Sequence, residues 1–461
     1  MSKFNFNLTP TTVPKVDTKY RKIVTQLPVP ESLEIIQTLY QYESSSMHGQ
    51  IPMIWDRAEG VQVFDAWGNQ WLDFTSTIFV ANAGHGNSRI IKALQEVLVK
   101  PLLHAYTYPT KERADYIKYL IEKTPAQFEK AFLLSAGTEA TECALKLMRM
   151  YGQKYGKKRP GILCFENNWH GRTMGAQMLC SNKSQKQWID SEDPNIHHLP
   201  FPYPWREEAN KNPRKYFRKQ LEKLLEEKSL SADTDFCGIM LETFQGWGAV
   251  FYPKEFVQEI EVFAKENNLL IAFDEMQAGF GRTGKLFGYQ HYEIEPDLLC
   301  CGKGASSSLP LSFVIGSQEV MDLPEVGSMS STHSANPSSC VAGKANLEAL
   351  LEDGLIENSR VLGEVFHSKL NKIKGRFPQH ISHVLGKGLI AALHFNTPDG
   401  IPLSNLCDRI CELAMQRGLL LVHTYRESIK LAPPLMITEE ALLDGISVLE
   451  EVIADCICQK Q

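Results

Sequence analysis

Lys303 is the residue whose surroundings most favour chemistry in this sequence. It lies in Gly302-Lys303-Gly304, followed by a run of small residues. Small neighbours let a lysine approach a planar ligand, and partial burial lowers the pKa of its ammonium toward the free amine that attacks an aldehyde. The residue types therefore predict a Schiff-base site; a surface lysine in a flexible loop is the alternative.

Asp274 ends an apolar run, residues 269–273, of the kind that forms a buried strand. A carboxylate in that place needs a partner, because burying an isolated charge is costly. The protonated pyridine nitrogen of pyridoxal phosphate (PLP) would be such a partner, since PLP accepts electrons only while that nitrogen stays positive. The alternative is an aspartate that caps the next helix.

The segment 274–284, with the sequence Asp-Glu-Met-Gln-Ala-Gly-Phe-Gly-Arg-Thr-Gly, extends this pattern. Together with Pro296-Asp297-Leu298 and Gly302-Lys303-Gly304, it resembles the signature of the class III (ω-amino acid type) aminotransferases. Matching motifs follow in the same order from about Trp55 to the C-terminal region, so the resemblance covers most of the chain. It implies a fold-type I PLP enzyme.

The resemblance also implies where the cofactor is held. Lys303 would form the Schiff base and Asp274 would pair with the pyridine nitrogen. Gly137 and Thr138 lie in a turn of small residues that opens a helical pattern, and a helix N-terminus suits the PLP phosphate. The other cofactor contacts that the resemblance implies within one chain are Trp169, His170, Glu242, Met276 and Gln277.

Three of these contacts carry specific expectations. Trp169, before His170-Gly171, would stack on the cofactor ring, although a tryptophan is often a plain packing residue. Gln277 would hydrogen-bond the 3-hydroxyl, and Met276 would pack beneath the ring. Thr332 would reach the phosphate of the neighbouring subunit, which implies a homodimer with shared sites.

Two positions depart from the family pattern. In members that use glutamate and 2-oxoglutarate, a glutamate after a Gln-Gly pair forms an ion pair with an arginine near the C-terminus. Here these positions hold Trp247 and Lys430. Lysine lacks the planar fork that binds a carboxylate through two hydrogen bonds, so specialisation for glutamate is not expected.

The substrate contacts stay open at this stage. Lys430 either binds a carboxylate, phosphate or phosphonate or is simply solvated, and Trp247 either fills space or stacks on the substrate. Ile78 and Phe79 fall in a region that lines the substrate entrance in the family, with core packing as the alternative.

The predicted function is a PLP-dependent aminotransferase that acts on a small primary amine or amino acid. A PLP-dependent lyase is the first alternative, because a lyase needs no second keto-acid substrate. It would release ammonia or phosphate from a small amino compound such as an aminophosphonate or aminoalkyl phosphate. An epimerase is the third possibility, and a PLP-free scaffold protein with the same fold is the non-enzymatic one.

The chain is expected to be an α/β protein with a large, mostly parallel sheet and a smaller α+β domain formed by the chain ends. From about residue 87 to 322, short apolar runs alternate with helical patterns. We expect residues 1–86 to contribute to the small domain, 87–356 to form the PLP-binding domain and 357–461 to complete the small domain. Residues 61–74 alternate around Gly68-Asn69 as a hairpin does.

Composition excludes several other classes. A net charge of −6 without charged blocks argues against nucleic-acid binding, and no apolar run is long enough to span a bilayer. The first residues do not resemble an export signal, and eleven cysteines without metal-ligand spacing favour free thiols in the cytoplasm. No metal site is expected.

Overall fold

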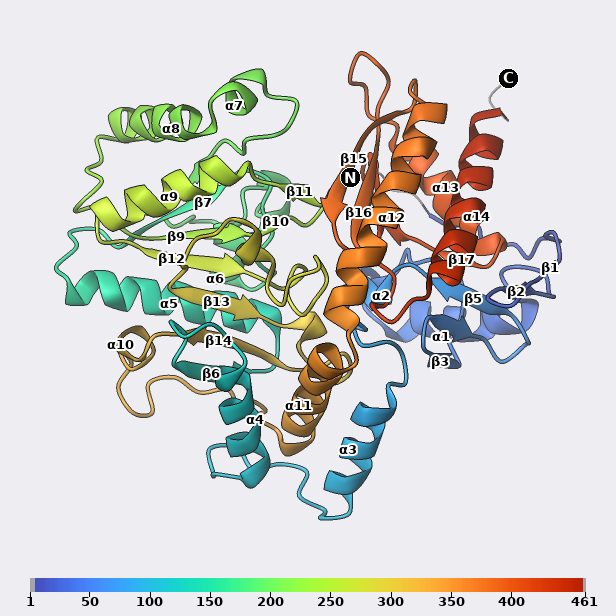
Figure 1. Cartoon of the computed structure of the whole chain (residues 1–461), viewed down its shortest axis with the longest axis horizontal. Coiled ribbons are helices and arrows are strands. Elements are labelled where there is room, and N and C mark those ends of the chain that lie inside the picture. The colour runs from blue at the N-terminus through green and yellow to red at the C-terminus, as the bar shows by residue number, and fades with distance from the viewer. Residues whose placement is uncertain (1–4, 459–461) are drawn as a thin grey trace.

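A seven-stranded sheet forms the centre of the larger part of the molecule in the computed structural model, which describes residues 5–458 (Figure 1). Residues 1–4, part of the segment in which no export signal is expected, lie outside the described residues. The strands in spatial order are β6 (Lys130–Leu134), β14 (Ser312–Gly316), β13 (Leu298–Cys301), β12 (Leu270–Asp274), β9 (Phe236–Glu242), β7 (Gly161–Phe165) and β8 (Ile196–Leu199). Only β14 runs antiparallel to its neighbours among these strands, so the mostly parallel sheet is confirmed.

Alternate residues of β12 pack against helices on opposite faces of this sheet. Leu270 and Ala272 share a core cluster with α5 (Gly137–Lys154), whereas Ile271 and Phe273 share another with α9 (Lys254–Glu266). Figure 1 shows α5 on one side of the strands and α9 on the other. Each large apolar side chain buried in this way contributes about 1.5–3 kcal/mol. This burial on both faces explains the continuous apolar runs in the sequence.

The two chain ends meet in a second sheet. The predicted hairpin is confirmed, because β4 (Gln62–Phe64) pairs antiparallel with β5 (Gln70–Asp73). On its other side β5 pairs with β17 (Leu419–Leu420), which comes from near the C-terminus. The remaining strands of this sheet are β1 (Val16–Asp17), β2 (Lys22–Ile23) and β3 (Arg57–Glu59). In Figure 1 the blue N-terminal strands and the red C-terminal helix lie together on the right.

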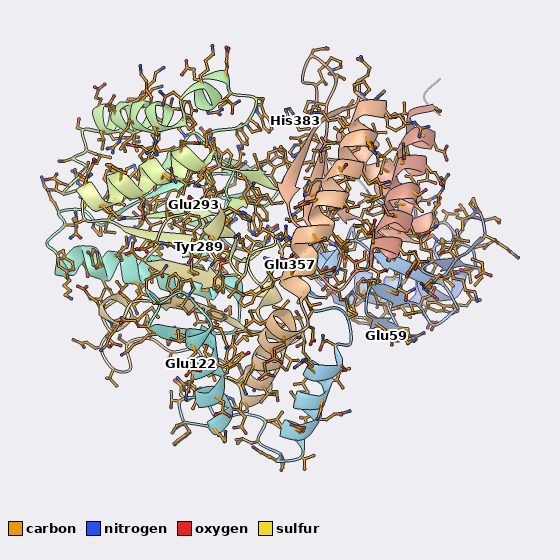
Figure 2. All side chains as sticks on the ribbon, viewed as in Figure 1. Glu59, Glu122, Tyr289, Glu293, Glu357 and His383 are labelled. Atoms are coloured by element: carbon orange, nitrogen blue, oxygen red, sulfur yellow. The ribbon has the colours of Figure 1, made fainter. Side chains whose placement is uncertain are left out.

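A third sheet carries residues that face the site described below. Its strands in spatial order are β15 (Ile381–Lys387), β16 (Ile390–Phe395), β19 (Ser428–Leu431) and β18 (Val422–His423). Two helices pack against it, α12 (Leu355–Arg376) and α13 (Ser404–Gln416), and α14 (Glu439–Cys458) packs against both helices. The centre of the Trp205 ring lies 5.4 Å from that of His383 in β15, which is labelled in Figure 2. This contact joins the third sheet to the larger part of the molecule.

The other elements connect these sheets. α11 (Pro337–Glu352) packs against α3 (Ser88–Leu98) and α4 (Lys111–Glu122). A longer helix, α8 (Pro213–Lys228), packs against α9. The remaining elements are short: α1 (Leu33–Tyr42), α2 (Ser76–Phe79), α6 (Met174–Leu179), α7 (Glu207–Lys211), α10 (Gln318–Met321), β10 (Phe244–Gln245), β11 (Val250–Phe251), η1 (Pro30–Ser32), η2 (Ser45–Met47), η3 (Lys183–Gln185), η4 (Gly288–His291) and η5 (Lys303–Ala305). Among residues 5–458, no helix combines the length and the apolar character needed to cross a membrane.

Candidate active site

The candidate site lies where adjacent parallel strands end. Asp274 is the last residue of β12, Glu242 is the last residue of β9, and the two are paired in register. Lys303 follows the neighbouring strand β13 after one glycine. Since the carboxyl ends of parallel strands share one edge of the sheet, the topology brings the amine and both carboxyl groups together.

Lys303 is held in an unusual backbone conformation. Its φ is 44°, in the left-handed region that side chains other than glycine rarely adopt. A Cβ on Gly302 would lie 2.6 Å from Met276 Sδ, and one on Gly304 would lie 2.5 Å from Asn82 Nδ2. Both flanking positions therefore require glycine. Burial lowers the pKa of Lys303, and the charges of Asp274 and Glu242 only partly oppose that shift. The neutral amine therefore forms at a lower pH than in a surface lysine.

Asp274 is fixed by two neighbours. Its Oδ1 accepts a hydrogen bond of 3.0 Å from the Met276 N–H, and its Oδ2 lies 2.9 Å from Nδ1 of His170. Both Asp274 and His170 are buried. The contacts hold one carboxylate orientation, as a group that pairs with a ligand nitrogen requires.

Glu242 is the second buried acid. It accepts hydrogen bonds of 3.0 Å from the backbone N–H groups of Trp169 and Gly246. Burial, and then the nearby charge of Asp274, raise the pKa of Glu242 well above its usual value. The hydrogen bonds from Trp169 and Gly246 oppose this shift in the pKa of Glu242.

The N-terminus of α5 faces the same space. The first N–H groups of a helix have no partner within the helix, and they bind anions such as phosphate. Glu139 accepts hydrogen bonds of 2.8 Å from the N–H groups of Ser135 and Ala136. Gly137 and Thr138 follow, and a Cβ on Gly137 would lie 2.8 Å from Met276 Sδ. The first residues of α5 are therefore packed closely against Met276 on one side and line the cavity on the other.

These groups surround a cavity of about 150 Å³. Its lining residues are Gly137, Thr138, Trp169, His170, Gly171, Glu242, Phe244, Asp274, Met276, Gln277, Ala278 and Lys303. An amine, an acid at a strand end and a helix N-terminus match the aldehyde, the pyridine nitrogen and the phosphate of PLP. The cavity therefore fits this cofactor.

The structure brings together all the expected cofactor residues except Thr332. Thr332 lies in a different hollow of the same chain, beside Ser135 and Glu139. Three lining residues received no role in the sequence analysis: Gly171, Phe244 and Ala278. Gly171 follows His170 in one expected motif, and its requirement for glycine appears only when the loop is seen against Thr138.

A wider hollow adjoins the cavity and shares Trp169, Gln277 and Lys303 with it. Ile78, Trp247 and Lys430 line this hollow, as the expectation of substrate contact requires. Phe79 lies in the core, and its ring centre is 4.5 Å from Lys430 Nζ. The turn containing Ile78 and Phe79 has φ values of 60° and 71°, which places the two adjacent side chains in different surroundings.

Lys430 is buried rather than solvated. Its Nζ donates hydrogen bonds to the Gly246 carbonyl at 2.7 Å and to Gln277 Oε1 at 3.2 Å. Burial, and then the positive charge of Lys303 nearby, lower the pKa of Lys430 to about 7. The indole N–H of Trp247 donates to Gln245 Oε1 at 2.9 Å, so this side chain is also fixed.

Residues 44–453 match the family model described as aminotransferase class-III. The chain belongs to this family. The match spans most of the sequence and includes every element that lines the cavity, which confirms the family resemblance and the fold class.

Named relatives of this aminotransferase have related but different activities. It is 31% identical over 457 residues to the alanine/serine racemase of Pyrococcus horikoshii, covering 96% of this chain and 94% of that protein. It is 32% identical over 410 residues to a probable 4-aminobutyrate aminotransferase of Bacillus subtilis, covering 86% and 91%. A solved amine transaminase from an uncultivated Pseudomonas species, in its PLP-bound form, has a TM-score of 0.81 at 23% identity and covers 90% and 97%.

The enzyme is thus a PLP-dependent aminotransferase, and these comparisons do not favour the lyase alternative. PLP supplies the aldehyde that takes up the amino group and a ring that accepts electrons. Asp274, Lys303 and the start of α5 line the cavity that would hold this cofactor.

Proposed function

We propose that this aminotransferase takes the amino group from a small primary amine or amino acid through a Schiff base at Lys303, and that it is not specialised for glutamate. The observation that carries the proposal is the buried Lys430, which donates its hydrogen bonds to Gly246 and Gln277. Trp247 supplies no carboxylate for a switch. Positions 247 and 430 therefore lack the acid and the guanidinium whose ion pair a glutamate-dependent enzyme uses.

The chain's own residues divide the work as follows. Lys303, once displaced by the substrate amine, would act as the base that removes the proton from the substrate carbon beside the nitrogen, and its ammonium would return that proton. Asp274, oriented by His170, would keep the pyridine nitrogen of PLP protonated. Gly137 and Thr138 would hold the phosphate, Trp169 and Met276 would contact the ring, and Gln277 would hydrogen-bond the 3-hydroxyl. Glu242 and His170 would be further contacts.

Racemisation is a second candidate activity, supported by the 31% identity to an alanine/serine racemase over 96% of this chain. It needs the same first proton transfer to Lys303. The two reactions differ in where the proton returns: the original carbon for a racemase and the cofactor side for an aminotransferase. A racemase therefore requires no keto acid.

The test uses purified PLP-loaded protein with amines, ω-amino acids and single enantiomers of α-amino acids, first without a keto acid. We expect the Schiff-base absorbance band to disappear in one turnover and to return on addition of pyruvate. Lys303→Ala should lack this band while keeping its secondary structure by circular dichroism. Inversion of an enantiomer without keto acid would establish the racemase instead, and absence of the band from the wild-type protein would refute the role of Lys303.

We further propose a homodimer in which Thr332 reaches the partner's cofactor, and a cytoplasmic location. The position of Thr332 outside its own chain's cavity supports the first proposal. Free cysteines support the second: among the described residues all except Cys458 are buried, and burial raises the pKa of the Cys143 thiol to about 12. Buried, protonated thiols suit a reducing compartment.

A further inference from the structure

Basic side chains dominate the hollow beside Lys303. Arg172, Lys183, Arg426 and Lys430 line it in addition to Lys303, and Glu427 is the one acidic residue among the described residues of its wall. A cleft lined by one sign of charge attracts ligands of the other sign.

Lys430 is not free, although it occupies the position where glutamate-dependent relatives place an arginine. Its ammonium is directed to the Gly246 carbonyl and to Gln277, and the side chain is buried. An anion that approached Lys430 would have to displace both hydrogen bonds. Lys430 is therefore expected to bind only weakly to a carboxylate attached to the carbon that carries the amine.

Arg426 is a second cation on the same hairpin, in the loop between β18 and β19. Its guanidinium carbon lies 3.8 Å from the centre of the Trp247 ring. Within residues 5–458 its guanidinium donates one hydrogen bond, of 3.2 Å from an Nη to Glu427 Oε1, and 34% of its side chain is exposed. Since a guanidinium carries five N–H donors, most of them remain available to a ligand.

The surface beneath Arg426 is fixed. The Ser428 hydroxyl donates to the Trp247 carbonyl at 2.9 Å, across 181 residues of sequence, and the indole N–H of Trp247 is held by Gln245. A stacked arginine on a fixed aromatic ring loses little freedom when it binds an anion through two parallel hydrogen bonds. Trp247 thus serves as a platform for a cation, at the position where relatives carry an acid.

Asn168 supplies an independent sign of a ligand in this hollow. It lines the wall and is 3% exposed, yet neither atom of its side-chain amide has a hydrogen-bond partner within residues 5–458. Buried amides are almost always hydrogen-bonded. A polar group of the substrate would complete the hydrogen bonds of Asn168.

We propose that Arg426, stacked on Trp247, binds a carboxylate at the end of the substrate remote from the reacting amine. The inference rests on the proposed function and narrows its amine donors to ω-amino acids. In this proposal the carboxylate is bound at position 426 instead of position 430 of the same hairpin, in the hollow that Lys303 also lines.

The test compares donors of matched length with and without the carboxylate: 6-aminohexanoate with hexylamine, and 4-aminobutyrate with butylamine. The half-reaction of the PLP-loaded protein is followed by its absorbance, without a keto acid. In Arg426→Gln we expect the half-saturating concentration of the ω-amino acids to rise by about ten- to a hundredfold, with the maximal rate nearly unchanged. This factor corresponds to the loss of one charged, hydrogen-bonded pair. The alkylamines should change less than about threefold, and Arg426→Lys should be intermediate.

Arg57→Gln is the matched control, because Arg57 also stacks on an aromatic ring, with its guanidinium carbon 3.6 Å from the Phe64 centroid, and lies 3.7 Å from Glu59. Arg57 does not line the hollow, so Arg57→Gln should leave the half-saturating concentration of every donor unchanged. Equal effects of Arg426→Gln on both members of a donor pair, or a selective loss in Arg172→Gln instead, would overturn the proposal. If the wild-type enzyme converts alkylamines as well as ω-amino acids, the aminotransferase proposal stands and this inference fails; no reaction with any donor refutes both.

Discussion

Lys430 illustrates how one substitution changes the chemistry of a pocket without changing its fold. An arginine at this position would stay charged in any protein, whereas a buried lysine shifts its pKa and becomes a neutral donor. Here burial and the nearby Lys303 lower the pKa of Lys430 to about 7 from its usual 10.5. Two amines can therefore share the site without a full charge on each.

This shift predicts a specific pH dependence of stability. Between pH 7 and pH 10.5 the unfolded chain holds a proton on Lys430 that the folded chain releases, so the free energy of unfolding should rise with pH in this window. Lys430→Met removes the contribution. The wild-type protein should gain up to about 1.4 kcal/mol per pH unit relative to the variant, and the difference should be flat below pH 7.

Urea unfolding of the PLP-free proteins, in which Lys303 is a free amine, measures this difference at several pH values. Lys118→Met is the control, because Lys118 lies on the exposed surface of α4 with 76% of its side chain accessible. Parallel pH profiles for wild type and Lys430→Met would show that Lys430 keeps its ordinary pKa in the folded protein.

At the scale of elements, the sequence predicts what depends on neighbours along the chain. The apolar run before Asp274 predicts a buried strand with an acid at its end, and the structure places it at the centre of the large sheet. The turn before α5 is likewise visible in its small residues. These features follow from local periodicity and from turns, which a single segment specifies.

The contacts of Arg426 and Asn168 could not be predicted in this way. Arg426 meets Trp247 only because the β18–β19 hairpin packs on Gly246 and Trp247, through Ser428 and Lys430. Asn168 lies in a recognised motif, but its lack of a partner is a property of the folded pocket. Pairings between distant segments depend on tertiary packing, which local patterns do not specify.

Gly171 offers a test of how tightly the loop after β7 is fitted to α5. Its φ is +144°, and a Cβ there would lie 2.3 Å from Thr138 Oγ1. Gly171→Ala should therefore displace Thr138 from the helix N-terminus and weaken PLP binding by about tenfold or more, since one lost phosphate contact corresponds to this factor. Titration of the apoprotein with PLP, followed by the Schiff-base band, measures the change.

Gly156→Ala separates the effect of the contact from that of the backbone. Gly156 also has a positive φ, +70°, but a Cβ there would meet nothing within 4 Å. Both variants carry backbone strain, and only Gly171→Ala should lose affinity for PLP. A similar loss in the two variants would mean that general destabilisation is the cause.

At the scale of the whole molecule, the site is built between parts that are distant in the sequence. The large sheet supplies Asp274 and Lys303, and the C-terminal sheet supplies Lys430 and the hairpin that carries Arg426. Thr332 is the expected cofactor residue that the chain does not bring to its own cavity. Ser331 beside it donates a hydrogen bond of 3.3 Å to Glu139 in the first turn of α5. The loop is thus anchored near the phosphate end of the site while Thr332 faces a different hollow, as a residue offered to a partner would.

Two heterodimers that contain the same substitutions in different arrangements test whether Thr332 acts across the interface. In the first, one chain carries Lys303→Ala and the other carries Thr332→Ala. If Thr332 serves the partner, the remaining Schiff-base site combines a native lysine with a native threonine, and its affinity for PLP should equal that of the wild type.

In the second heterodimer, one chain carries both substitutions and the other is wild type. Its remaining site would then lack the threonine hydroxyl, and its affinity should fall by about tenfold, the value of one hydrogen bond to a charged phosphate. Differently tagged chains allow each heterodimer to be purified and titrated with PLP by absorbance. The opposite order of affinities would place Thr332 at its own chain's cofactor, and equal affinities would leave Thr332 without a role in binding.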